Sequence, residues 1–287
     1  MKFSIVTPSF NQGRFLERCM RSVLEQESAE VEYIVVDGGS SDGSVATIEK
    51  YSSRLAYWKS RKDRGYADAL NTGFARGTGE IMGWINSDDM LTPWALRVAA
   101  SIFAALPEVE WITTLYPLVM DEDGMVIAAR RGEGYNAKAF YRGRNVPLAE
   151  GFYTSVIQQE STFWRRTLWE RAGTRMDADL RMAADLELWA RFFQYTKLYT
   201  VGVPLGCFRF QKESFTSSRM GSYLDECRAV LGRYPYRAPS GVERTARRIA
   251  RLLPRRVQPL TGLAYPVFHI RQEGRGSQWK IDREWIL

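Results

Sequence analysis

The sequence predicts an α/β protein with a mostly parallel central sheet, and two observations support this. Short apolar runs rich in β-branched residues alternate with segments whose apolar residues recur at helical spacing. Such alternation indicates crossover connections that place helices on both faces of a parallel sheet. The chain has 287 residues, enough for one large domain or for one domain with an extension.

The elements predicted from this alternation follow one another without long gaps. Apolar runs that end at Pro, Gly or Asp mark strands, and apolar residues three or four positions apart mark helices. We expect a strand at 2–8, a helix at 13–26, a strand and turn at 31–44, a helix at 44–53, a short strand and loop at 55–63, a helix at 66–79, a strand at 80–89 and a helix at 92–106. Thr92 is expected to cap the last helix, with Pro93 in its first turn.

The cysteines and the chain start exclude several classes of protein. The number of cysteines is odd, three, and none are paired at a short spacing, which disfavours a disulfide framework or a cysteine zinc site and fits a reducing compartment. The first apolar run is too short for a signal peptide, and no run reaches the roughly 18 apolar residues that a membrane span needs. We expect a cytoplasmic protein, or one peripheral to the inner face of the cell membrane.

The formal charge of +7 is concentrated near the C-terminus. Residues 233–287 hold 12 basic and 4 acidic residues, a net charge of +8, so the preceding 232 residues hold 28 basic and 29 acidic ones. Residues 244–257 contain six arginines and no acid. Such a block favours an anionic membrane surface or nucleic acid as partner, although a solvated helix before a turn at Pro254 explains it equally well.

Acidic residues stand where the first strands end. Asp37, the Asp42 turn and the pair Asp88 and Asp89 fall at the edge where parallel sheets bind ligands. No glycine-rich dinucleotide or P-loop motif follows the first strand, which disfavours a nicotinamide or P-loop site. Adjacent carboxylates repel each other, so Asp88 and Asp89 require compensation from a metal ion, a basic side chain or solvent.

Four segments, taken together and in order, resemble one enzyme family. IVTPSFNQGRFLERCMRSVLEQ, EYIVVDGGSSDGS, DRGYADALNTGFARGTGEIMGWINSDD and AADLELWARF are similar to segments of the family 2 inverting glycosyltransferases of the GT-A fold, of the type that builds bacterial surface polysaccharide. The resemblance covers roughly residues 1–215. It implies a single GT-A domain at 1–225, with a nucleotide-sugar half at about 1–115 and an acceptor half at about 116–225. Residues 226–287 are then a basic, partly helical extension.

The resemblance implies a site for a nucleoside-diphosphate sugar donor. Pro8 and Phe10 match positions that line the base, and Asp37 matches a carboxylate that accepts from its ring N–H. Arg64 and Asp68 are weaker candidates for contacts to ribose or phosphate. Two structural alternatives stand beside these roles. Asp37 fits a turn before two glycines, and Arg64 with Asp68 fits an exposed salt bridge.

The segment NSDD matches the metal motif of the family. Asp89 is implied as a direct ligand of Mg²⁺ or Mn²⁺, and Asp88 as a neighbour of the ribose or of the metal's water shell. Few carboxylates, completed by diphosphate oxygens, suit such hard cations. The fuller motif has an acid where Asn86 stands, which weakens the expected metal affinity. The structural alternative is that Asp88 or Asp89 caps the following helix.

The second half is expected to bind a saccharide or lipid-linked saccharide acceptor. Asp185 matches the family's catalytic base, although the acid that often precedes it is Ala184 here. An inverting transfer needs one carboxylate to take the proton of the acceptor hydroxyl. Favourable interaction with the helix dipole is the alternative role for Asp185, and the rival bases are Asp179 and Glu187.

Other positions carry weaker expectations. Gln159 and Trp164 are candidates for contacts to acceptor sugar, and Trp164 fits the core as well. Gln211 stands where the family often has a histidine at the metal or diphosphate, so Gln211, Lys212 or Arg209 would have to replace it. The single histidine, His269, lies in an apolar segment and is expected to be structural, and having only one histidine disfavours Ser-His-Asp and histidine-rich zinc mechanisms.

Three other functions compete with a metal-dependent glycosyltransferase. A sugar nucleotidyltransferase shares a related sheet but needs a glycine-rich basic loop after the first strand, which TPSFNQGRF matches poorly. A catalytically silent binding module would explain the departures at Asn86, Ala184 and Gln211. A nucleic-acid binder is not expected, because the basic segment lacks any recognised nucleic-acid motif.

Overall fold

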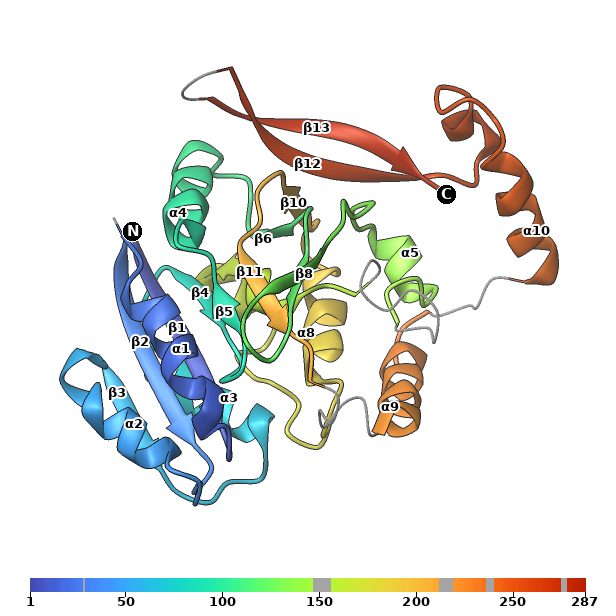
Figure 1. Cartoon of the computed structure of the whole chain (residues 1–287). Helices are drawn as coiled ribbons and strands as arrows, with labels where there is room; N and C mark the ends of the chain where they lie inside the picture. The colour runs from blue at the N-terminus through green and yellow to red at the C-terminus, as the bar shows by residue number, and fades with distance from the viewer. Residues whose placement is uncertain (28, 147–155, 212–218, 236–239, 275–277) are drawn as a thin grey trace.

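The computed structural model describes residues 1–27, 29–146, 156–211, 219–235, 240–274 and 278–287 (Figure 1). Its central sheet has nine strands among these residues and is mostly parallel, which confirms the predicted α/β class. In spatial order the strands are β13 (Gln278–Ile286), β12 (Tyr265–Glu273), β10 (Tyr199–Val201), β6 (Trp111–Thr114), β9 (Phe163–Arg165), β4 (Ile81–Trp84), β1 (Lys2–Ser9), β2 (Glu30–Asp37) and β3 (Tyr57–Ser60).

The strand pairing brings the ends of the first strands to one edge of the sheet. β1 runs parallel to β2 with Ser9 opposite Asp37, and parallel to β4 with Val6 opposite Trp84. Strand β9 lies antiparallel between β4 and β6 and joins the two halves of the sheet. The carboxyl ends of β1, β2 and β4 therefore meet at the edge where the sequence places its acidic residues.

A second, four-stranded sheet lies beside that edge. It contains β5 (Met90–Leu91), β11 (Gly206–Arg209), β7 (Leu118–Met120) and β8 (Val126–Ala129), in that order. Strand β11 pairs antiparallel with β5 and parallel with β7. Because β5 directly follows the Asp88–Asp89 pair, the small sheet brings Arg209 of the second half of the chain to the acidic strand end.

Helices cover both faces of the central sheet, as the alternation predicts. One apolar cluster holds α1 (Gly13–Leu24), α2 (Ser44–Lys50) and α4 (Ala95–Ala105), and the other holds α3 (Tyr66–Phe74), α5 (Ala137–Tyr141), α7 (Arg166–Arg171), α8 (Ala184–Phe192) and α9 (Met220–Gly232). The period of two in β1 divides its side chains between them. Phe3 and Ile5 join the first cluster, and Val6 joins the second. Short 3₁₀ turns, η1 (Ser52–Arg54), η2 (Gln159–Ser161) and η4 (Gln258–Thr261), complete the fold with α10 (Gly241–Ala250).

The second cluster is centred on stacked tryptophans. The indole of Trp189 in α8 lies between Trp84 of β4, at 5.4 Å between ring centroids and 13° between planes, and Trp111 of β6, at 5.2 Å and 27°. Trp164 of β9 packs edge-on against Trp84 and Trp189. Large stacked rings of this kind bury much apolar area and fix the position of the helix that carries them.

Two predicted element ends differ in the structure. Helix α4 begins at Ala95 with Trp94 at its N-cap, so the prediction that Thr92 caps it was wrong. Thr92 is held elsewhere, because its N–H donates to the carbonyl of Leu205 at 3.0 Å beside strands β5 and β11. Strand β4 ends at Trp84, earlier than predicted, and a turn follows in which the Asp89 N–H donates to the carbonyl of Asn86 at 3.1 Å.

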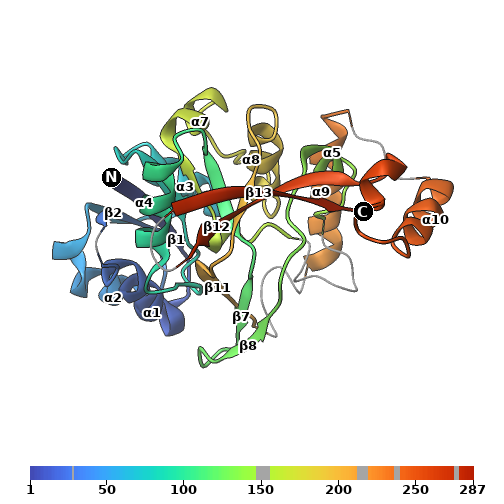
Figure 2. The same ribbon diagram turned by 90° about the horizontal axis from the view of Figure 1, so that it is seen from above.

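The segment predicted as a C-terminal extension contributes strands to the central sheet. β12 pairs in parallel with β10, and β13 folds back on β12 as an antiparallel hairpin. Figures 1 and 2 both show this hairpin running from beside α4 toward α10. No helix within the described ranges has the length and apolar character that crossing a membrane requires. The domain boundary at residue 225 stays a prediction.

Replacing Trp189 with alanine tests the role of the tryptophan stack. Trp189→Ala is expected to lower the free energy of unfolding by about 3–5 kcal/mol, because it empties a fully packed site. The matched control is Trp285→Ala, since Trp285 is 36% exposed and its loss should cost about 1 kcal/mol or less. Urea denaturation of both variants measures the difference, and equal losses would contradict the proposed importance of the stack.

Candidate functional site

The acidic pair at the end of β4 is held by hydrogen bonds from the second half of the chain. Asp89 is only 1% exposed. Its Oδ1 accepts from the backbone N–H of Arg209 at 2.8 Å, and its Oδ2 accepts from Nε2 of Gln159 at 3.2 Å. Neither Asp88 nor Asp89 caps α4, which begins without a side-chain cap. The pair is therefore joined to strand β11 and to η2, and the capping alternative does not apply.

Arg209 supplies a buried positive charge beside the acidic pair and lowers the pKa values of both acids in part. Its guanidinium is buried beneath the pair, with Nε donating to the carbonyl of Asp88 at 2.6 Å and the group lying 4.8 Å from the ring centroid of Phe15. Nη1 donates to the carbonyls of Asp121 and Glu122, both at 2.9 Å. All of these acceptors are backbone carbonyls. The guanidinium of Arg209 therefore attracts the two carboxylates electrostatically and not through hydrogen bonds.

Gln211 stands where the family often has a histidine, and its side chain contacts the acidic pair. Its Nε2 donates to Oδ2 of Asp88 at 2.6 Å. A neutral amide orients the Asp88 carboxylate without adding positive charge. Arg209 is likewise at the site, whereas Lys212 lies outside the described residues.

Glu160 belongs to this cluster but was not predicted from the sequence. It is 2% exposed, lies in η2 next to Gln159, and its Oε1 has no hydrogen-bond partner among the described residues. Burial, together with repulsion from Asp88 and Asp185, raises the pKa of Glu160 to about 8. Its only sequence signal is an acid within the otherwise apolar and amide-rich VIQQESTFW.

A glycine permits the close approach of η2 to the small sheet. A Cβ atom on Gly206 of β11 would lie 2.4 Å from the carbonyl oxygen of Glu160, nearer than such atoms ever approach. Any larger residue would displace η2, and with it Gln159 and Glu160. A glycine at position 206 is therefore needed for Glu160 to lie beside Asp88 and Asp89.

The acidic groups fit a hard divalent cation bound together with a ligand. Burial, followed by repulsion from Asp88 and Glu160, raises the pKa of Asp89 well above its usual range, and burial also raises the pKa of Asp88. A cation would reverse this effect, since it favours the ionised carboxylates. Within the described ranges, no three His, Cys, Asp or Glu side chains form a complete metal site. The donor set suits Mg²⁺ or Mn²⁺ held by one or two carboxylates with phosphate oxygens completing the shell.

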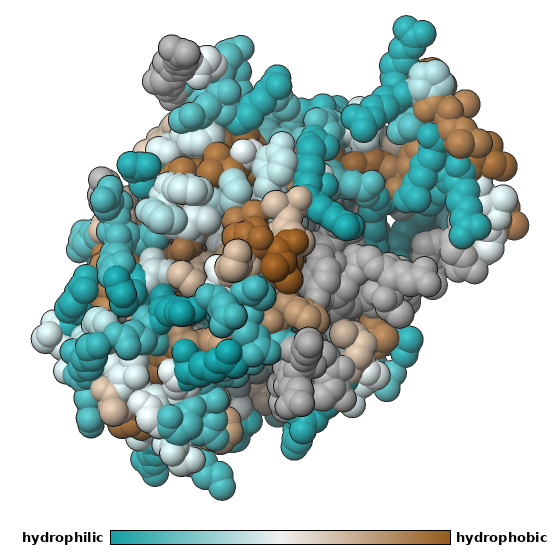
Figure 3. Space-filling view, in the orientation of Figure 1, coloured by the Kyte–Doolittle hydropathy of each residue, from teal (hydrophilic) through white to brown (hydrophobic). Residues whose placement is uncertain are grey.

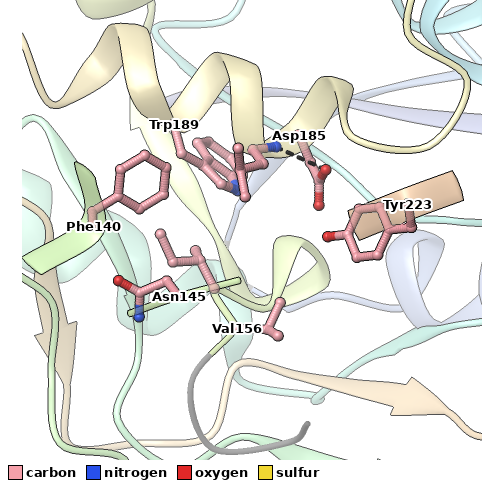
Figure 4. A pocket seen from close by; sticks show the side chains of 8 residues that line it. Phe140, Asn145, Val156, Asp185, Trp189 and Tyr223 are labelled. Atoms are coloured by element: carbon pink, nitrogen blue, oxygen red, sulfur yellow. Dashed lines mark hydrogen bonds between the residues drawn. The ribbon is translucent and has the colours of Figure 1, made fainter. Parts of the chain in front are cut away.

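Asp185 lies at the start of α8 and lines a small pocket. Phe140, Trp189 and Tyr223 form part of its wall (Figure 4). The Oδ1 atom of Asp185 accepts from the N–H of Leu186 at 2.7 Å, and Figure 4 shows its carboxyl group directed toward Tyr223. Burial, aided by the negative charge of Glu226, raises the pKa of Asp185 to about 6. At neutral pH this carboxyl group is mostly ionised and able to accept a proton.

The backbone N–H groups just before α8 and that of its first residue are bound by residues other than Asp185, whereas the N–H of its third residue, Leu186, donates to Asp185. Glu226 of α9 accepts from the N–H groups of Arg181, Met182 and Ala183 at 2.9–3.1 Å. The hydroxyl of Tyr66 accepts from the next N–H, that of Ala184, at 2.9 Å. Asp185 accepts one N–H of the first turn, so its helix-dipole alternative stands beside the role of base, while Glu226 and Tyr66 hold the backbone that leads into α8.

The rival bases are placed less favourably than Asp185. Glu187 forms a paired contact with Arg191, whose Nε donates to both carboxylate oxygens at 2.9 and 3.0 Å. Asp179 is exposed on the surface. Of the three acids, only Asp185 combines a pocket position with a carboxylate that no basic side chain engages within the described residues.

The predicted base site lies at the ends of β1 and β2. Pro8 is buried in β1, whereas Phe10, just beyond it, is 62% exposed. Asp37 is fully buried, and its Oδ2 accepts from the N–H groups of Gly39 and Ser40 at 3.0 and 2.9 Å. It therefore builds the turn that the structural alternative describes. Asp63 also lies at this site. Its carboxylate and the ring of Phe10 are both next to Gly38, so close that a Cβ atom on that glycine would contact them.

The remaining candidates are not all brought to the site. Arg64 and Asp68 form an exposed i,i+4 salt bridge at 3.0 Å, as the alternative for them predicts. Gln159 reaches Asp89 and is part of the acidic cluster. Trp164 is fully buried among the stacked tryptophans, so its ring is a core element out of reach of a saccharide.

Comparison with known proteins shows similarity to glycosyltransferases. Residues 4–109 match the family model described as Glycosyl transferase family 2. An uncharacterized glycosyltransferase of Mycobacterium tuberculosis is 29% identical over 189 residues, covering 66% of this chain and 67% of that protein. An O-antigen biosynthesis protein, RfbC of Myxococcus xanthus, is 31% identical over 144 residues, covering 48% of this chain and 10% of that protein.

Two solved structures share the fold. S. aureus TarS 1–349 in complex with UDP-GlcNAc has a TM-score of 0.60 at 16% identity, over 90% of this chain and 69% of that one. The mannosyltransferase PcManGT from Pyrobaculum calidifontis, in complex with GDP-Man and Mn²⁺, has a TM-score of 0.60 at 21% identity, over 83% and 65%. The match spans only 38% of the longer TarS chain. Residues 4–109 are therefore similar to the family 2 glycosyl transferases, and the chain shares the GT-A fold of these solved structures.

Proposed function

We propose that this protein transfers a sugar, with inversion, from a nucleoside-diphosphate sugar to a hydroxyl of a saccharide or lipid-linked saccharide. The observation that carries the proposal is the gathering of Asp88, Asp89 and Glu160 at the end of β4, with Asp185 within electrostatic range of Glu160. The first half of the chain would thus supply the acidic strand end that binds the sugar donor, and the second half would supply the general base. The similarity to an O-antigen biosynthesis protein supports a role in surface polysaccharide synthesis.

The donor is proposed to bind across the ends of β1, β2 and β4. Pro8 and Phe10 would contact the nucleotide base, while Asp37 shapes the loop beneath it. Asp89 would hold Mg²⁺ or Mn²⁺, with Asp88 beside it, oriented by Gln211. When bound, that cation would stabilise the negative charge that develops on the leaving diphosphate.

Asp185 is proposed to act as the general base. Its ionised carboxylate takes the proton of the acceptor hydroxyl as that oxygen forms a bond to the anomeric carbon. The bond between the anomeric carbon and the diphosphate oxygen breaks on the opposite face, and the nucleoside diphosphate leaves with the bonding electrons. Glu226 and Tyr66 are positioning residues, because they fix the start of α8 that carries Asp185.

Donor binding is tested with Asp89→Asn. We expect UDP, GDP, dTDP or CMP to raise the unfolding midpoint of the wild type in the presence of Mn²⁺, since a ligand at about 100 times its Kd adds about 2.7 kcal/mol. Asp89→Asn should lose this shift yet fold at least as well, because burial disfavours the charged form of Asp89. Asp225→Asn, at an exposed ion pair on α9, is the control and should keep the shift. A Mn²⁺-dependent shift that survives Asp89→Asn would exclude Asp89 as the ligand.

Transfer is tested with Asp185→Asn. Loss of a general base should lower kcat by about 10²–10⁴-fold while the donor still raises the unfolding midpoint. Asp179→Asn removes the exposed rival acid and should leave kcat unchanged. Sugar release from the donor, with and without acceptor saccharides, provides the assay. If wild type binds donor but neither hydrolyses nor transfers it, the chain is a silent nucleotide-sugar-binding module.

The pH dependence of transfer is tested with Glu226→Gln. The base acts when ionised, so kcat/KM of the wild type should fall about tenfold per pH unit below the pKa of Asp185, which is about 6. Glu226 raises that pKa, and a neutral glutamine removes its charge while keeping an oxygen for the N–H groups of Met182 and Ala183. The acidic limb should therefore move to lower pH in Glu226→Gln. An unmoved limb would show that another group controls it.

A further inference from the structure

Helix α10 and the turns after it expose apolar side chains to solvent. Val242 is 80% exposed, Ile249 61%, Leu252 85% and Leu260 83%. Val242 and Ile249 are seven residues apart in α10, which places them on one face of the helix, and Leu252 and Leu260 lie in the turns that follow it. We call these four residues the α10 apolar stripe. Amphipathic helices of globular proteins usually turn their apolar face toward the core, whereas α10 turns it toward solvent.

The orientation of α10 is fixed by its polar side. The guanidinium of Arg247 lies 4.5 Å from the ring centroid of Tyr265, and its Nη2 donates to the hydroxyl of that residue at 2.5 Å. Arg251 donates to the carbonyl of Leu287 at 3.3 Å. Glu243 pairs with Arg142 at 3.2 Å. Two of the arginines thus attach the helix to the body of the protein and hold the apolar stripe outward.

Positive charge flanks the apolar stripe. Arg248, Arg255 and Arg256 are exposed, and the only acid in residues 240–262 is Glu243, which is paired with Arg142. Figure 3 shows a brown patch over α10 at the upper right with hydrophilic side chains beside it. Apolar side chains bordered by arginines match the acyl boundary and the phosphates of an anionic leaflet.

We propose that the α10 apolar stripe inserts into the interface of an anionic membrane, with Arg248, Arg255 and Arg256 on the headgroup phosphates. The sequence alone predicted contact through the arginine block at 244–257. The structure assigns the apolar contact to the stripe and removes Arg247 and Arg251 from the contact, because they are engaged by the protein itself. A protein partner or a second copy of the chain would not need this excess of exposed arginine.

The membrane surface lies next to the element that lines the Asp185 pocket. Phe140 of α5 forms part of the pocket wall, and Arg142, two residues later, makes the ion pair with Glu243 of α10. A membrane-bound α10 would therefore place this wall near the bilayer, where a lipid-linked acceptor presents its sugar. This step rests on the proposed transferase function, whereas membrane binding itself does not.

Flotation of the full chain with lipid vesicles tests the proposal. We expect flotation with vesicles of phosphatidylcholine and phosphatidylglycerol but not with phosphatidylcholine alone. Ile249→Ser/Leu252→Ser should weaken binding at least about tenfold, because two exposed apolar groups lose their burial in the interface. Met125→Ser/Ile127→Ser removes equally exposed apolar residues of the β7–β8 hairpin, 70% and 57% exposed, and should leave binding unchanged.

A second variant tests the charges. Arg248→Gln/Arg255→Gln/Arg256→Gln should lose about fivefold in binding per arginine, about a hundredfold in all, and most of the salt sensitivity. Unchanged thermal midpoints would show that both variants fold. The proposal is overturned if the wild type fails to float with anionic vesicles, or if the two stripe substitutions have no more effect than the hairpin control. A dimer in sedimentation that Ile249→Ser/Leu252→Ser dissociates, without flotation, would assign the stripe to a second copy.

The two proposals fail in different experiments. Flotation needs no nucleotide, and the donor-induced shift needs no lipid. Flotation without any donor binding would keep the membrane surface and remove the transferase function. Asp185-dependent transfer without flotation would keep the transferase function and remove the membrane surface.

Discussion

The site depends on one packing interaction, the insertion of Trp189 between Trp84 and Trp111. Trp189 lies one helical turn after Asp185 in α8, and Trp84 ends the strand that leads to Asp88 and Asp89. The stack thus joins the strand end proposed to bind the donor to the helix proposed to carry the base. Rings packed on both faces leave α8 little freedom to tilt or slide, so the separation of the two groups is set by the core.

The charge balance around this core explains why the acids are unusual. Burial raises the pKa values of Asp88, Asp89 and Glu160, with repulsion between acids adding to it at Asp89 and Glu160, and the buried guanidinium of Arg209 donates to backbone carbonyls. A fold that gathers buried carboxylates disfavours their ionised forms unless positive charge arrives with a ligand. Burial also raises the pKa of Asp185, but only to about 6, so that group is mostly ionised near neutral pH.

The C-terminal part of the chain combines a structural and a surface role. Strands β12 and β13 extend the central sheet beyond β10, and α9 supplies Glu226 to the start of α8. Helix α10 is attached through its arginines and presents its apolar residues to solvent. Removing the whole segment would therefore disturb the sheet and the base together, so point substitutions on α10 are the informative ones.

The sequence by itself determined the α/β class, the order of the first elements and the acidic strand end, because these follow from local periodicity and from residues adjacent in the chain. It also pointed to Asp185, through a motif on one helix. Arg209 was one of three candidates that the resemblance offered, but only the tertiary structure brought Glu160 and Glu226 to the site, since each acts on a group more than 40 residues away and no local pattern encodes that meeting. The direction of α10 was likewise decided by packing. The sequence shows the apolar residues and the arginines of this segment, but contacts with Tyr265 and Leu287 determine which side of α10 faces solvent.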